Sequence, residues 1–137
     1  MTEDAPFDDA AASAVMARFA SAYFSKDPSR IADAITDDAE WHFAFGSDAP
    51  DGRVRRGLAG FMQGISENDE LFERLRFDNV ITRPFGEAQI LMTYLANGRY
   101  RHGGDFALRG VELITVRDGR IAMKDVFWKQ NTYGGHQ

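Results

Sequence analysis

Two early segments of the chain carry apolar residues at intervals of three and four, which places them on one face of a helix. The first follows an acidic pair at positions 8–9, where negative charge suits a helix N-terminus. It predicts a helix of roughly four to five turns, whose apolar face holds Ala12, Val15, Met16, Phe19 and Tyr23. A short second helix has Asp27 as its N-cap and Pro28 in its first turn, and ends at Asp37-Asp38. The same spacing predicts a third helix from Leu58, Phe61, Met62 and Ile65, with residues 68–75 adding a further turn or two.

Alternation of apolar and polar residues replaces this spacing elsewhere and predicts strands. In residues 39–45, one side holds Trp41, Phe43 and Phe45 and the other holds Glu40, His42 and Ala44. Residues 46–57 are expected to form a loop. Four later strands are expected over 76–83, 88–96, 106–117 and 120–130, with turns at Pro84-Phe85-Gly86, Asn97-Gly98 and Asp118-Gly119. Helices followed by an antiparallel meander indicate an α+β fold with the helices on one face of the sheet.

The last two predicted strands are apolar on both faces, whereas an antiparallel sheet with one face in water alternates more cleanly. The helices can cover one face. A second copy of the sheet is the economical cover for the other, through a two-fold homodimer. This predicts contacts of Leu113, Met123 or Phe127 across the convex sheet face. The alternative is that threonine and methionine are simply tolerated on an exposed face.

Composition narrows the function classes. The chain has 137 residues, 44% of them hydrophobic, which suits a single domain, expected over residues 8–130 with flexible termini at 1–7 and 131–137. It has no cysteine, and its three histidines form no metal-ligand motif, so we expect no metal and no cofactor. The net charge of −5 disfavours nucleic acid and anionic membranes as partners. An acidic start unlike a signal peptide, and no apolar run of membrane-spanning length, indicate a cytoplasmic protein.

The order of these elements and several motifs resemble the SnoaL-like (polyketide-cyclase-like) branch of the nuclear transport factor 2-like and ketosteroid isomerase-like superfamily. The motifs are FASAYFSKD (19–27), ITDDAEWHF (35–43), GLAGFM (57–62) and, most specifically, RGVELITVRDGRIAMKDVFWK (109–129). The resemblance implies a cone-shaped, cystatin-like fold in which a curved antiparallel sheet wraps on the N-terminal helices. It also implies a deep apolar pocket and usually a homodimer. It does not imply one reaction, because the superfamily includes isomerases, dehydratases, cyclases and plain binding proteins.

Departures from the family pattern bear on the chemistry. Aligned with ketosteroid isomerases, Phe19 stands where a tyrosine hydroxyl is used and Phe43 where the general-base aspartate is used, whereas Glu112 keeps the later carboxyl. Phe24 stands where dehydratases of the superfamily carry an aspartate, and Trp128 lies in the region where SnoaL-type cyclases carry an acid. Because an apolar side chain neither takes nor gives a proton, the resemblance implies that this protein is not an efficient ketosteroid isomerase.

Glu112 and Lys124 are the first candidates for catalysis. A two-residue turn at Asp118-Gly119 would place Glu112 opposite Asp125, whereas a three-residue turn would place it opposite Lys124. The second register brings opposite charges together and is favoured. The family alignment also turns both side chains toward the concave face. A lysine paired in this way binds a carbonyl oxygen or an oxyanion rather than acting as a base. The alternative is a structural cross-strand ion pair.

His42 completes the catalytic candidates, although it faces away from Trp41 and Phe43. The residues expected to contact a ligand are Phe19, Tyr23, Trp41, Phe43, Phe61, Tyr94 and Trp128, with core packing as the alternative for each. We therefore expect a lyase, isomerase or cyclase acting on a small hydrophobic ring-containing carbonyl compound. In that reaction Glu112 supplies a proton or hydrogen bond and Lys124 polarises an oxygen. The alternative is a dimeric protein that binds a small hydrophobic ligand without turnover.

Overall fold

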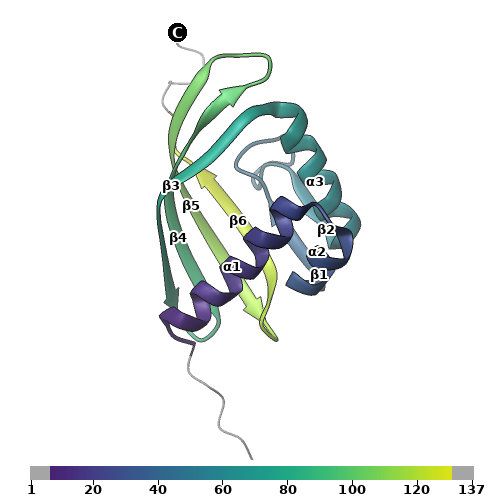
Figure 1. Cartoon of the computed structure of the whole chain (residues 1–137), viewed down its shortest axis with the longest axis vertical. Coiled ribbons are helices and arrows are strands. Elements are labelled where there is room, and N and C mark those ends of the chain that lie inside the picture. Colours follow the sequence, from purple (N-terminus) through teal and green to yellow (C-terminus); the bar gives the residue numbers. More distant parts are fainter. Residues whose placement is uncertain (1–6, 131–137) are drawn as a thin grey trace, which may run out of the picture.

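Residues 7–130, the part of the chain that the computed structural model describes, form one six-stranded sheet with three helices on one of its faces (Figure 1). The strands are β1 (Ile35–His42), β2 (Val54–Arg56), β3 (Phe72–Phe85), β4 (Gln89–Tyr100), β5 (Asp105–Arg117) and β6 (Arg120–Trp128). Their order in the sheet is β2-β1-β6-β5-β4-β3. The expected α+β class is confirmed. The sheet is mixed rather than wholly antiparallel, because β1 and β6 pair in parallel.

The helices are α1 (Asp9–Ser25), α2 (Pro28–Ala34) and α3 (Gly57–Leu71). The first two begin where their capping residues predict. Asp8 accepts a hydrogen bond from the Ala11 amide (2.9 Å), and Asp27 accepts one from the Ser29 amide (3.0 Å). These bonds satisfy amide groups that have no partner within the helix. Lys26 ends α1 in the left-handed conformation (φ 57°), and its amide donates back to the last turn.

The structure corrects three element boundaries. Asp37 and Asp38 lie within β1 and do not end α2, because the pairing of β1 with β6 already begins at Ile35. Residues 54–56, expected in a loop, form the edge strand β2 against β1. Residues 72–75 belong to β3 and not to a helix, since their backbone pairs with β4.

The predicted turn at Asn97-Gly98 is also wrong, because both residues lie inside β4. The connection to β5 is made by residues 101–104. Gly98 serves a different purpose: a Cβ atom there would lie 2.0 Å from the carbonyl oxygen of Arg74. The glycine therefore permits a close approach of β3 to β4, which is one of the reasons for glycine within a strand.

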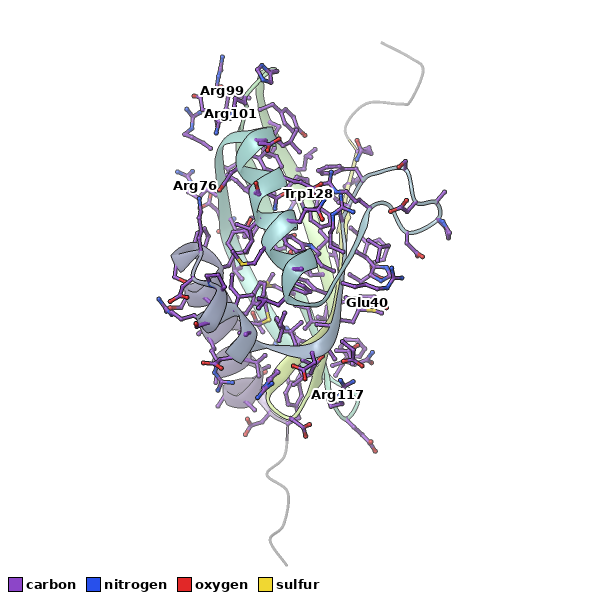
Figure 2. All side chains as sticks on the ribbon, turned by 90° about the vertical axis from the view of Figure 1, so that its right-hand side faces the viewer. Glu40, Arg76, Arg99, Arg101, Arg117 and Trp128 are labelled. Carbon is purple, nitrogen blue, oxygen red and sulfur yellow. The ribbon has the colours of Figure 1, made fainter. Side chains whose placement is uncertain are left out.

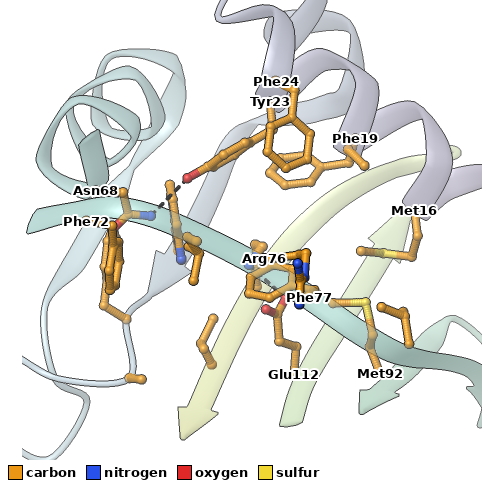
Figure 3. A pocket seen from close by; sticks show the side chains of 18 of the residues that line it. Met16, Phe19, Tyr23, Phe24, Asn68, Phe72, Arg76, Phe77, Met92 and Glu112 are labelled. Carbon is orange, nitrogen blue, oxygen red and sulfur yellow. Dashed lines mark hydrogen bonds and ion pairs between the residues drawn. The ribbon is translucent and has the colours of Figure 1, made fainter. Parts of the chain in front are cut away.

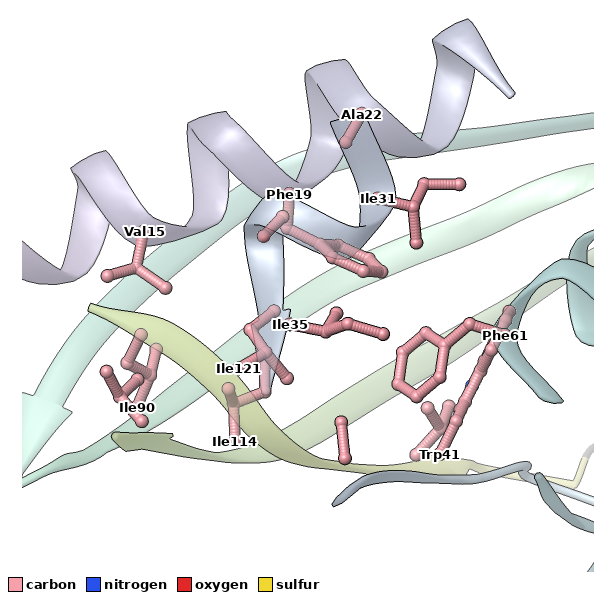
Figure 4. Packing of buried hydrophobic residues seen from close by; sticks show 14 of the residues in the cluster. Val15, Phe19, Ala22, Ile31, Ile35, Trp41, Phe61, Ile90, Ile114 and Ile121 are labelled. Atoms are coloured by element: carbon pink, nitrogen blue, oxygen red, sulfur yellow. The ribbon is translucent and has the colours of Figure 1, made fainter. Parts of the chain in front are cut away.

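The hydrophobic core lies between the helices and the inner face of the sheet, meaning the face turned toward α1 (Figure 4). Its largest members include Phe19, Ile31, Ile35, Trp41, Phe61, Ile90, Ile114 and Ile121. Phe7, which the sequence analysis places in a flexible terminus, packs half-buried against this core. The rest of the termini expected to be flexible, 1–6 and 131–137, lies outside the described residues.

Candidate functional site: an apolar cavity with a buried ion pair

A cavity of about 690 Å³ lies between α1 and the inner face of the sheet (Figure 3). Nine aromatic residues contribute to its wall: Phe19, Tyr23, Phe24, Trp41, Phe43, Phe45, Phe72, Phe77 and Trp128. A cavity of this size and apolar character is typical of sites for small organic ligands. Five of the seven residues expected to contact a ligand line it: Phe19, Tyr23, Trp41, Phe43 and Trp128.

Glu112 on β5 and Lys124 on β6 both line this cavity and form an ion pair, with Lys124 Nζ 2.7 Å from Glu112 Oε1. Both are buried, with exposed fractions of 1% and 7%. The favoured three-residue turn is wrong, because Arg117 pairs with Arg120 across a two-residue turn. A register shift farther along the ladder also keeps Glu112 from facing Asp125. Glu112 lies opposite Val126, and Lys124 is two residues before Val126 on the same face, so the two charges meet diagonally.

Tyr94 supports Glu112 from β4. Its hydroxyl donates to Glu112 Oε2 (2.6 Å) and accepts a hydrogen bond from the indole N–H of Trp128 (3.0 Å). Burial, and next the nearby Glu112 carboxylate, raise the pKa of Tyr94 far above its ordinary value of 10.0, so the phenol keeps its proton. Tyr94 does not itself line the cavity. It orients the carboxylate and is not a ligand contact as the sequence suggested.

Lys124 faces two aromatic rings besides its carboxylate. Its Nζ lies 5.1 Å from the ring centre of Trp41 and 5.9 Å from that of Phe19. Trp41 is its direct neighbour on the parallel strand β1. Ring faces attract a cation, but they do not accept all three of its N–H groups. Within residues 7–130, Glu112 is the anion that Lys124 contacts, which leaves ammonium N–H groups for a ligand oxygen.

The structure does not bring His42 to the cavity. Strand alternation turns it to the outer face, where its Nε2 lies 2.9 Å from Glu40 Oε1. Glu40 in turn accepts from Arg56 (3.1 Å) and lies on the side of the molecule away from α1 (Figure 2). His42, expected as a catalytic residue, therefore does not line the cavity with Glu112 and Lys124.

Phe61, expected to contact a ligand, does not line the cavity either. It is fully buried in the core, with ring centres 5.5 Å from Trp41 and 6.2 Å from Phe19. Phe61 packs against these two cavity residues on the side away from the cavity and is not expected to contact a ligand.

The sequence did not lead us to expect several other residues in the cavity wall: Phe45, Asn68, Phe72, Arg76, Phe77 and Met92. Phe45 and Phe72 come from different segments and both approach Trp128, with ring centres 6.1 Å and 5.9 Å away. The sequence carries a signal for two of them. Phe45 shares one side of the predicted strand 39–45 with Trp41 and Phe43, which both line the cavity. Phe77 is an aromatic residue in a predicted strand, but only the packing of β3 against α1 turns it toward the cavity.

Within residues 7–130, no group of three or more His, Cys, Asp or Glu side chains could hold a metal ion. Over the same residues, no helix is long and apolar enough to cross a membrane.

A family model described as a SnoaL-like domain matches residues 16–123, more than half of the chain. The chain belongs to the SnoaL-like family. The resemblance seen in its motifs is thereby confirmed. The family match includes Glu112 and ends one residue before Lys124. A search of curated proteins gives no match.

Solved structures share the fold of this SnoaL-like protein. An NTF2-like protein from Burkholderia xenovorans LB400 is 17% identical, with a TM-score of 0.74 over 88% of this chain and 90% of that chain. A protein from Xanthomonas campestris pv. campestris, described as "a putative polyketide cyclase", is 15% identical, with a TM-score of 0.71 over 88% and 91%. A protein with a ketosteroid isomerase-like fold from Catenulispora acidiphila DSM 44928, in complex with trimethylamine, is 14% identical, with a TM-score of 0.67 over 84% and 85%.

Proposed function

We propose that this SnoaL-like protein is an isomerase, lyase or cyclase that binds a small, apolar, ring-containing carbonyl compound in the cavity. The observation that carries the proposal is the Glu112–Lys124 ion pair, buried among aromatic side chains. Burying two charges costs solvation free energy, and the attraction between them does not always offset this cost. Charged groups held in an apolar cavity are typical of functional sites. Aromatic walls favour a flat apolar ring, and the ammonium group favours an oxygen atom.

The chemistry we propose is removal of a proton next to the carbonyl group. The carbonyl oxygen accepts a hydrogen bond from Lys124 Nζ. Glu112 Oε1 takes the proton from the adjacent carbon, and the electron pair of that C–H bond forms the C=C bond of an enolate whose oxygen faces the ammonium group. Return of the proton to another carbon completes an isomerisation. Attack of the enolate carbon on a second carbonyl group closes a ring.

Binding without turnover is the second function, and the engagement of Glu112 supports it. Its Oε2 already accepts from Tyr94, while Oε1 is buried against Lys124. Glu112 acts as a base only if a bound ligand draws Lys124 aside and uncovers Oε1. Phe19 and Phe43 offer no substitute, because neither side chain can exchange a proton.

The bicyclic ketone 2-tetralone tests both functions, because the protons next to its carbonyl group are exchangeable. We expect it to bind and, in D₂O, to incorporate deuterium faster with the protein than in buffer, as followed by NMR. Glu112→Gln should lose this acceleration, in which general-base assistance is worth about 10²–10⁴-fold. The matched control Glu87→Gln alters an exposed turn residue and should keep it. Binding without acceleration would favour the second function, and no binding would overturn both.

We also propose that a second copy of the chain covers the outer face of the sheet. Leu113 and Phe127 are 37% and 52% exposed there. Leu91 lies beside Leu113, and Val111 lies beside Phe127, so the apolar surface continues over β4, β5 and β6. Exposed apolar surface of this continuity favours association. A two-fold axis would place the same surface on both partners.

A further inference from the structure

A second polar group faces the cavity from the side opposite the ion pair. Tyr23 on α1 lines the cavity, and Figure 3 shows its hydroxyl beside Asn68, across the cavity from Glu112. Asn68 Nδ2 donates a hydrogen bond to the Tyr23 hydroxyl oxygen (3.0 Å). Asn68 itself lies near the end of α3, so the hydroxyl is held by an element other than its own.

The hydrogen of the Tyr23 hydroxyl is the unused part of this arrangement. A phenol can accept and donate at once, and within residues 7–130 the structure shows Tyr23 only accepting. Tyr94 shows the contrast, because its hydroxyl both donates and accepts and is complete without a ligand. Burial is the main cause that raises the pKa of Tyr23, so the group stays a neutral donor at ordinary pH.

Tyr23 and Lys124 lie near the same two aromatic side chains of the cavity wall. The ring centre of Tyr23 lies 6.1 Å from Phe19 and 6.1 Å from Trp41. The same two rings are the ones that face Lys124 Nζ, at 5.9 Å and 5.1 Å. An apolar ring packed on Phe19 and Trp41 therefore has a hydroxyl donor toward one edge and an ammonium donor toward another.

We infer that the ligand carries two acceptor oxygens on different edges of one apolar ring system, one bound by Lys124 and the other by Tyr23. This rests on the proposed function, in which the cavity binds an oxygen-bearing ring compound. It narrows the ligand class to hydroxy-ketones and diketones. Ring compounds with two hydroxyl groups present the same two acceptor oxygens and serve as probes. Tyr23 becomes the residue that distinguishes such compounds from those with a single oxygen, and Asn68 positions its hydroxyl.

Isothermal titration with 2-naphthol and with the 1,5-, 2,6- and 2,7-dihydroxynaphthalenes tests this inference. These probes share one ring system. The 2,6- and 2,7-diols add a second oxygen to 2-naphthol, and the 1,5-diol places both oxygens at other edges. We expect the best-fitting diol to bind about 2- to 10-fold more tightly than 2-naphthol, the range of one net hydrogen bond. Tyr23→Phe removes only the hydroxyl and should abolish this gain while leaving the affinity for 2-naphthol unchanged.

The matched control is Tyr100→Phe, because Tyr100 stacks on Phe72 outside the cavity wall. It should keep the gain from the second oxygen. Equal binding of 2-naphthol and every diol by the unmodified protein would overturn the inference, and so would a gain that survives Tyr23→Phe. Failure of all four probes to bind would instead overturn the proposed function, so the two failures are distinguishable.

Discussion

Lys124 lies diagonally across the β5–β6 ladder from Glu112, on the same face of the sheet, because β6 contains one extra residue. Beyond the pair Val116–Ile121, the ladder skips Ala122. Such a β-bulge moves every later residue of the strand to the opposite face relative to an uninterrupted ladder. Without it, Lys124 would lie on the outer face and Glu112 would be buried without its cation.

We expect Glu112→Gln and Lys124→Met each to lower the free energy of unfolding by about 3–5 kcal/mol, because each leaves the other charge buried alone. The double variant removes both charges and should cost much less than the sum of the two. Urea denaturation followed by circular dichroism measures all three. Additive losses would show that the two groups are not energetically coupled.

Gly110→Ala should disturb the support of the ion pair. Gly110 lies opposite Tyr94, and a Cβ atom there would lie 2.3 Å from the tyrosine ring. Displacing this packed ring should cost about 1–3 kcal/mol. Gly104→Ala is the matched control, since nothing lies within 4 Å of the added Cβ atom. Thermal unfolding compares the two, and equal melting temperatures would contradict the packing described for Tyr94.

Stability should fall as the pH rises above about 10. Burial raises the pKa of Tyr94 and of Tyr23 above the ordinary value of 10.0. The unfolded chain loses these phenol protons at the ordinary value, whereas the folded chain holds them. The stabilisation that these two tyrosines contribute is therefore complete at pH values below their pKa in the unfolded chain. It is lost as the pH rises toward their pKa in the folded chain. Tyr94→Phe should flatten this alkaline decline in urea titrations, and an unchanged decline would show that Tyr94 does not cause it.

Sedimentation at micromolar concentration should show a dimer. Phe127→Asp places a charge in the exposed apolar surface of the outer face and should shift the protein to a monomer. Phe24→Asp is the control, because Phe24 is 69% exposed but lies on α1 at the cavity and not on the outer face of the sheet. It should leave the dimer intact. A monomeric unmodified protein would refute the proposed assembly.

Efficient isomerisation of Δ5-3-ketosteroids is not expected. The positions that match the base and the tyrosine donor of ketosteroid isomerases hold Phe43 and Phe19, and both line the cavity. Without a base at the position of Phe43, removal of the steroid proton should be slower by about 10²–10⁴-fold. A dienone absorbance assay measures the turnover. A rate comparable to that of a dedicated isomerase would mean that another residue acts as the base.

The candidate site could be predicted in part. The opposite charges of Glu112 and Lys124 on two neighbouring predicted strands indicated that they meet, and the aromatic positions Phe19, Trp41 and Trp128 indicated the wall. The pairing of the charges was right although the favoured three-residue turn was wrong. The turn has two residues, and a bulge, which has no sequence pattern of its own here, brings the two charges together. Phe61 and Tyr94 were wrongly expected in the cavity wall. Alternation and periodicity predict on which face of a strand or helix a residue lies, but not whether that face borders a cavity or the packed core.

The sequence by itself determined α1 and α2, the hairpin turn at Asp118-Gly119 and the membership of the SnoaL-like family. Capping, helical periodicity and turn preferences act over a few neighbouring residues, so they can be read without the rest of the fold. Only the tertiary structure decided the parallel pairing of β1 with β6, the continuation of β4 through Asn97 and Gly98, and the meeting of Tyr23 with Asn68. Each of these depends on contacts between segments distant in the chain, and such contacts outweigh local preference because they form many hydrogen bonds and packing interactions together.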